Sequence, residues 1–143
     1  DETIKLSSYF STLKTYVSNF SYLESNYGQR SLAHAPTHKY GFGIDKDLSK
    51  FIMGLTLSVN SNYVSSFYFE EQNNIKSNAY NLIDASLNYE IKNISVSLWA
   101  KNLMDEKYTI RGYQFILDPT YEMKSFQTYG DLKSVGITID YNL

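Results

Sequence analysis

Residues 79–101 hold two runs in which apolar and polar side chains alternate, with almost no turn between them. Successive side chains of a β-strand point to opposite faces, so the alternation predicts two antiparallel strands, at 79–91 and 94–101. Their apolar parity carries Ile83, Ala85, Leu87, Tyr89, Ile91, Ile94, Val96, Leu98 and Ala100. The runs are about as long as a tilted membrane-spanning strand, which has roughly ten residues. This pair of strands constrains the fold more than any other part of the chain.

The same alternation recurs along the chain and predicts further strands. We expect one long strand at 4–22, a strand at 40–44, another at 55–69 and a last one at 135–143. The segments 24–39, 70–78 and 109–134 are polar or mixed, and are expected to be connections. The sequence therefore predicts an all-β fold, an antiparallel meander of about six long strands.

The lengths of the connections also follow a pattern. Those near residues 48 and 92 are short, whereas those near 30, 74 and 120 are long. Outer-membrane barrels show this asymmetry, with short turns on the periplasmic side and long loops outside. The last strand follows a long connection, so the C-terminal end of the chain is expected at the periplasmic rim.

The polar parity of these strands is made mainly of Ser, Thr and Asn, with few long charged side chains. Small polar residues suit the wet lumen of a large barrel, while the apolar parity meets lipid. We therefore expect the strands to form part of a transmembrane β-barrel. Lipid forbids open strand edges, and known barrels begin at about eight strands. Six strands would belong to a larger barrel or would close by association.

Composition excludes several other classes of protein. The chain has 143 residues and a net charge of −2, without a basic stretch, so we expect no nucleic-acid partner. It has no cysteine, which excludes disulfides and thiolate metal sites. No apolar run approaches the about 20 residues of a transmembrane helix.

No catalytic set is evident, so the chain is not expected to be an enzyme or to carry a cofactor. It lacks a G-x-S-x-G elbow and a glycine-rich phosphate loop. Asp84 with Glu90, or Asp105 with Glu106, are carboxylate pairs, but on alternating strands such residues are usually lumen or rim groups.

His34 and His38 are spaced four residues apart, which suggests a metal pair on a helix. Pro36 lies between them and opposes a helix, and no carboxylate has the required spacing. We expect a loop and the start of a strand here, without a metal site.

Three stretches resemble the TonB-dependent outer-membrane receptors. The segment LWAKNLMDEKYTIRGYQF (98–115) contains Asn102-Leu103-Met104-Asp105-Glu106-Lys107-Tyr108, which is similar to the family's Asn-Leu-(aromatic or Met)-Asp-x-x-Tyr motif closing the penultimate strand. Ala35-Pro36-Thr37-His38 resembles its APxH entry to a strand. Tyr129-Gly130-Asp131-Leu132 resembles its Gly-Asp-Pro-Arg approach to the final strand, with Leu132 in place of Pro. Order and spacing hold over residues 30–143.

The resemblance implies a bacterial outer-membrane barrel of about 22 strands that encloses an N-terminal plug. Such receptors import metal chelates, usually ferric siderophores, with energy delivered through TonB. Residues 1–143 would be the C-terminal segment of the barrel, supplying its last six strands, with the plug, the TonB-contact segment and the earlier strands absent. The implied partners are outer-membrane lipid, the chelate, the remaining strands, and TonB through the plug.

Tyr108, Arg111, Tyr113 and Phe115 form a cluster with two open interpretations. Aromatic faces with a guanidinium nearby can hold a flat, anionic chelate by stacking, cation–π contact and charge-assisted hydrogen bonds. The alternative is an aromatic girdle at the outer membrane interface. Tyr68 and Phe69 face the same choice. Phe69 continues the apolar parity, which favours the girdle. The candidate ligand-binding residues are Tyr108, Arg111, Tyr113 and Tyr68.

Two other classes of protein stay open at this point. One is a soluble or secreted all-β module that binds carbohydrate or another ligand, which would not depend on detergent. The other is a small barrel that oligomerises to close its wall, which the mass of the purified particle would reveal.

Overall fold

A computed structural model describes residues 3–116 and 121–142. Within these residues the chain forms ten β-strands, and none of the residues belongs to a helix long and apolar enough to cross a lipid bilayer. The strands are β1 (Ile4–Thr12), β2 (Val17–Tyr22), β3 (Ser25–Arg30), β4 (His38–Asp47), β5 (Leu55–Val64), β6 (Tyr80–Ile91), β7 (Ile94–Lys101), β8 (Thr109–Ile116), β9 (Met123–Tyr129) and β10 (Ser134–Tyr141). The predicted all-β fold is confirmed.

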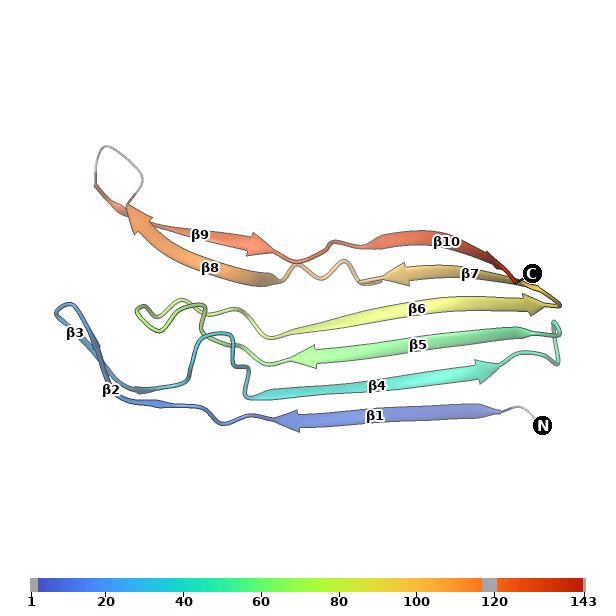
Figure 1. Cartoon of the computed structure of the whole chain (residues 1–143), viewed down its shortest axis with the longest axis horizontal. Helices are drawn as coiled ribbons and strands as arrows, with labels where there is room; N and C mark the ends of the chain where they lie inside the picture. The colour runs from blue at the N-terminus through green and yellow to red at the C-terminus, as the bar shows by residue number, and fades with distance from the viewer. Residues whose placement is uncertain (1–2, 117–120, 143) are drawn as a thin grey trace.

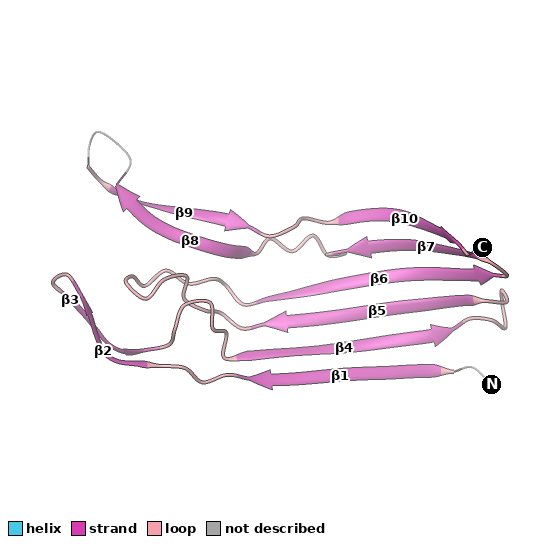
Figure 2. Cartoon of the chain, in the orientation of Figure 1, coloured by secondary structure: helices cyan, strands magenta, loops and turns pink. Residues whose placement is uncertain are grey.

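Six of the strands form one antiparallel sheet in the order β1-β4-β5-β6-β7-β10, which Figure 1 shows as a long, curved wall. The other four strands form two hairpins, β2–β3 and β8–β9. Each hairpin lies within a connection between two neighbouring strands of the sheet, so the chain still follows a meander (Figure 2). The six strands expected from the sequence are the six strands of this wall.

The register of the sheet aligns the apolar parity of all six strands on one face. One row of paired residues crosses the whole sheet and is apolar throughout: Leu6, Ile44, Val59, Ala85, Ala100 and Val135. The side chains of this face are uncovered, because Leu6 is 72% exposed and Ile139 is 70% exposed. Among the described residues Phe69 is the only large hydrophobic side chain that is buried, so no second layer covers the face. A broad exposed apolar face of this kind fits a hydrocarbon environment.

The opposite face carries small polar side chains that hydrogen-bond along the sheet. Ser97 Oγ donates to Asn88 Oδ1 at 2.6 Å, and the phenol of Tyr9 donates to Asn62 Oδ1 at 3.1 Å. The large Trp99 ring lies over Gly136, where a Cβ atom would stand 2.3 Å from its Cζ2 atom. The ring occupies the space that a side chain at residue 136 would fill, and its Nε1 donates to Thr138 Oγ1 at 3.1 Å.

The two ends of the wall differ, as the connection lengths predicted. The short connections at 48–54 and 92–93 lie at one end, called here the turn end. The long connections, 13–37, 65–79 and 102–133, lie at the other, called the loop end (Figure 1). The C-terminal end of the described chain lies at the turn end, where the Asn142 amide donates to the carbonyl of Asn93 at 2.9 Å.

Several strand boundaries differ from the sequence-based prediction. The single strand expected at 4–22 is wrong, because β1 ends at Thr12 and β2 turns away into a hairpin. The expected connections 24–39 and 109–134 contain β3 and the β8–β9 hairpin, and β5 ends at Val64 instead of residue 69. β3 pairs with β2, and β8 pairs with β9, so these strands form hairpins at the loop end and do not pair with the wall. The end of the last predicted strand, Leu143, lies outside the described residues.

Candidate ligand-binding site at the loop end

Asn102 is the centre of the turn that leads the chain from β7 out of the wall. Its side chain is 4% exposed, and its backbone has a positive φ of 47°. Its amide nitrogen donates to the carbonyls of Glu106, at 2.9 Å, and Asp131, at 3.0 Å, and its Oδ1 accepts from the Glu106 amide at 2.9 Å. Its own backbone amide donates to Asp84 Oδ1 at 2.9 Å. Asn102 thus ties the start and the end of the connection 102–133 to β6.

Tyr108, the last residue of the same motif, packs inside this turn. Its ring centroid lies 4.5 Å from that of Tyr80, and its carbonyl accepts from the Gly130 amide at 2.9 Å. A Cβ atom at residue 130 would overlap the Tyr108 ring, at 2.1 Å from Cζ. Only glycine lets the returning chain pass this close. Tyr108 therefore anchors the base of the β8–β9 hairpin.

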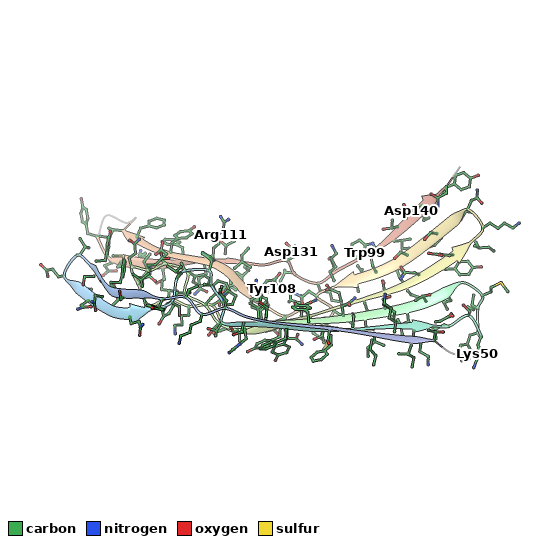
Figure 3. All side chains as sticks on the ribbon, turned by 60° about the horizontal axis from the view of Figure 1, so that its bottom comes forward. Lys50, Trp99, Tyr108, Arg111, Asp131 and Asp140 are labelled. Carbon is green, nitrogen blue, oxygen red and sulfur yellow. The ribbon has the colours of Figure 1, made fainter. Side chains whose placement is uncertain are left out.

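One face of the β8–β9 hairpin carries a row of aromatic rings. Tyr113 and Phe115 alternate along β8, and Phe126 pairs with Tyr113 from β9. The three ring planes are parallel to within 18°, with centroids 4.9–5.9 Å apart. Arg111 precedes the row at the same parity of β8, and Figure 3 shows it pointing to the same side of the molecule as Trp99 and Asp140. The row thus continues on the side of the polar face.

All three long connections meet in an open hollow of about 410 Å³, called here the loop-end hollow. The ring of Phe69 forms its floor and is only 2% exposed, because it packs against the backbone of Gly112. The prediction that Phe69 belongs to a membrane girdle is therefore wrong. The residues that line the hollow are His34, Phe69, Glu70, Ile110, Arg111, Gly112 and Tyr113.

A family model described as "TonB dependent receptor-like, beta-barrel" matches residues 4–103 of the chain. The chain belongs to this family of TonB-dependent receptor barrels. The match covers β1 to β7 and ends just after Asn102, while the resemblance noted in the sequence continues to residue 143. A search among curated proteins finds no match.

Membership of the TonB-dependent receptor family places the wall in the outer membrane and makes it part of a transporter. These receptors are transporters of the bacterial outer membrane and not enzymes, and they work with TonB and a ligand. In such barrels the apolar face meets lipid and the long loops lie outside the cell. The loop-end hollow therefore opens on the extracellular side of this receptor barrel.

The lipid-facing side of the receptor barrel has its own aromatic residues at the loop end. The rings of Tyr40 and Tyr63 stack across β4 and β5, 4.4 Å apart, and Phe10 of β1 stacks on His38. They end the apolar face where the wall meets the loops, which is the position of an interfacial girdle. The aromatic residues in the position of a girdle thus come from β1, β4 and β5. Tyr108 and Tyr113 belong to the β8–β9 hairpin and its base instead.

The structure brings together only some of the candidate residues. Arg111 and Tyr113 line the loop-end hollow, whereas Tyr108 lies at the base of the hairpin. Tyr68 lies one residue before the floor, with the guanidinium of Arg30 and the ammonium of Lys76 each 4.2 Å from its ring centroid. Sequence reasoning missed Phe69 and Glu70 as lining residues.

The two histidines, His34 and His38, lie in different surroundings. His34 lines the hollow, with its ring 5.5 Å from that of Phe67, and His38 stacks on Phe10 at the lipid-facing margin. Within residues 3–116 and 121–142 no three His, Cys, Asp or Glu side chains gather as a metal site would require.

Proposed function

We propose that this chain is part of a receptor that captures a metal chelate of the ferric siderophore class at the loop-end hollow and imports it. The observation that carries the proposal is that Arg111 and Tyr113 are among the residues that line one hollow, together with Phe69 and Glu70. The guanidinium supplies fixed positive charge for an anionic chelate, and the phenol ring supplies a stacking surface. The aromatic row that begins at Tyr113 extends this surface outward along the hairpin.

The hollow suits a ligand that carries both charge and flat apolar groups. Phe69 closes the floor with an apolar ring, while Glu70 and His34 add polar groups at the side. A concave site with an apolar floor and few polar groups is the usual form of a small-molecule site. Tyr68 and Tyr108 support this site from behind in our proposal and do not contact the ligand.

We also propose that residues 1–143 are the C-terminal strands of a larger barrel whose plug contacts TonB. Support comes from the edges of the wall, because β1 and β10 each pair with only one neighbour among the described strands. Strand edges in lipid require partners, so further strands or further copies must complete the wall. The coding sequence upstream tests the first possibility, and the mass of the purified particle tests the second.

Capture is tested by replacing Arg111 and Tyr113 together with Ala in the receptor expressed in the outer membrane. Binding is measured with radioactive iron loaded on a catecholate, a hydroxamate and a carboxylate chelator. We expect the affinity for the chelate that the parent binds to fall by about tenfold or more. The matched control replaces Lys14 and Tyr16, a cation and a phenol on the first long connection that do not line the hollow. Unchanged affinity in the Arg111 and Tyr113 variant would refute capture at this site.

A further inference from the structure

We propose that Arg30 is the positioning residue of the loop-end hollow: from outside it, Arg30 holds the segment that supplies the floor. The effect of Arg30 on ligand binding rests on the proposed function, whereas its hold on the segment does not. Arg30 ends β3 and is 6% exposed, which is rare for a charged side chain that has no carboxylate partner among the described residues. Its burial indicates that the guanidinium acts on the segment packed around it.

The guanidinium hydrogen-bonds to backbone carbonyls that follow Phe69 in the chain. Its Nη2 atom donates to the carbonyl of Glu70, at 3.4 Å, and to the carbonyl of Asn73. Its Cζ atom lies 4.2 Å from the centroid of the Tyr68 ring and 4.9 Å from that of the Tyr27 ring. Arg30 therefore contacts the chain on both sides of Phe69, at Tyr68 and at Glu70.

Neighbouring contacts make the same connection between the two segments. The Tyr27 phenol donates to the Gln72 carbonyl at 2.6 Å, and the His34 amide donates to the Tyr68 carbonyl at 2.8 Å. The Ala33 amide donates to Glu71 Oε1 at 2.9 Å. Residues 68–73 are thus held against the first long connection by four backbone carbonyls and the Glu71 carboxylate.

The chemistry of this contact requires arginine. A guanidinium is planar, so it can stack between two phenol rings while its edge donates to two carbonyls, whereas a lysine ammonium is a point charge. Arg30 Nε and Nη1 are buried and have no acceptor among the described residues. Unpaired buried donors oppose stability. The contacts of Arg30 with two aromatic rings and two carbonyls offset this cost.

The consequence reaches the ligand through two side chains. Phe69 forms the floor and Glu70 lines the side of the hollow, and both belong to the segment that Arg30 holds. Release of the segment would let the floor move relative to Arg111 and Tyr113 on the hairpin. Arg30 thus sets the distance between the two sides of the hollow without touching the ligand.

Distance measurement between spin labels tests this role in the receptor without any ligand. The chain has no cysteine of its own, so labels can be placed at Gln72→Cys on the held segment and Lys107→Cys at the base of the hairpin. We expect a narrow distance distribution in the parent, a broadened one in Arg30→Met, and an intermediate one in Arg30→Lys. An unchanged distribution in Arg30→Met would overturn the proposal.

Lys76→Met is the matched control, because Lys76 contacts the same Tyr68 ring at the same distance as Arg30. It removes a cation–π contact from that ring but leaves the Glu70 and Asn73 carbonyls held, so its distribution should stay narrow. Broadening equal to that of Arg30→Met would also overturn the proposal, because the ring contact alone would then hold the segment. Gel migration of unheated samples checks that the wall of each variant is folded, and Arg30→Lys serves if Arg30→Met is not.

Ligand binding supplies the second arm. With the chelate that the parent binds, Arg30→Met should weaken affinity by about tenfold, while the transport rate at saturation stays close to that of the parent. A fall in the saturated rate without loss of affinity would contradict a positioning role. If no chelate of the panel binds even the parent, the proposed function fails, and the distance measurement still decides the role of Arg30.

Discussion

Gly112 lies directly against the ring of Phe69, so that a Cβ atom at residue 112 would stand 2.5 Å from Cδ2 of that ring. This contact joins the β8–β9 hairpin to the segment 65–79, and it forms the bottom of the loop-end hollow. Phe69 is the one large hydrophobic side chain that is buried among the described residues. The outer loops therefore have a small core of their own, separate from the wall.

Gly112→Ala should separate the hairpin from Phe69, because the added methyl group overlaps the ring. We expect faster cleavage of the hairpin when intact cells are treated with trypsin, since Arg111 and Lys124 lie in it. Ile116→Ala is the matched control, because Ile116 lies on the same parity of β8 and is 50% exposed. Equal cleavage of Gly112→Ala and the parent would show that the ring moves aside without freeing the hairpin.

Asn102→Ala should destabilise the turn that carries the hairpin. It removes the donors to the Glu106 and Asp131 carbonyls and the acceptor for the Glu106 amide, all in a buried place. The expected loss is about 2–3 kcal/mol of unfolding free energy, measured by denaturant titration of the purified receptor in detergent. Asn102→Asp keeps an acceptor oxygen and should lose less.

Glu106→Ala is the control for the Asn102 variants, because Glu106 joins these hydrogen bonds through backbone atoms only. Its unfolding free energy should stay within about 0.5 kcal/mol of the parent, as for most surface changes. A loss as large as that of Asn102→Ala would mean that residue 106 contributes through its side chain, contrary to the observed bonds.

The wall could be predicted from the sequence because alternation is a local signal. Once Leu57, Leu87 and Leu98 share a parity, pairing of their strands places them in one row, and they are paired in the structure. The hairpins could not be predicted in this way. β2 and β3 are mostly polar and lack an apolar parity, and they are held by contacts such as that of Arg30 with residues 70 and 73.

Only the residues that β8 contributes to the candidate site could be predicted from the sequence. Arg111 and Tyr113 stand out in the sequence because a cation and aromatic residues follow a recognisable motif. Phe69, Glu70 and His34 come from two other connections, and no local pattern links them to residue 111. The available signal was the placement of every long connection at one end of the meander, which predicts that their residues meet there.

Gly54→Ala should destabilise the turn end of the wall far more than Gly28→Ala destabilises the first hairpin. Both glycines have positive φ, 81° and 60°. A Cβ atom at residue 54 would stand 2.1 Å from the carbonyl oxygen of Glu90, whereas nothing lies within 4 Å of one at residue 28. Gly28→Ala should therefore lose only the conformational term, about 1–2 kcal/mol.

The comparison uses the unfolding free energy of both variants in detergent, and the folded fraction that reaches the outer membrane. Gly54→Ala must also displace backbone at β6, because the Glu90 amide donates to the Gly54 carbonyl at 2.9 Å. We expect a reduced folded fraction for Gly54→Ala alone. Equal losses in the two variants would show that positive φ, and not the contact with Glu90, sets the requirement for glycine.

The orientation of the wall is tested by two arginine substitutions at adjacent residues of β7. Leu98 lies on the apolar face, between Leu87 and Ile137, and Ser97 lies on the polar face beside Asn88 and Thr138. Leu98→Arg places a charge in the hydrocarbon and should make folding into phosphatidylcholine vesicles less favourable by about 2–4 kcal/mol. Ser97→Arg loses only its hydrogen bond with Asn88, worth about 1 kcal/mol, because its charge stays in water. A larger loss for Ser97→Arg than for Leu98→Arg would mean that the polar face meets the lipid, and the assignment of inside and outside would have to be reversed.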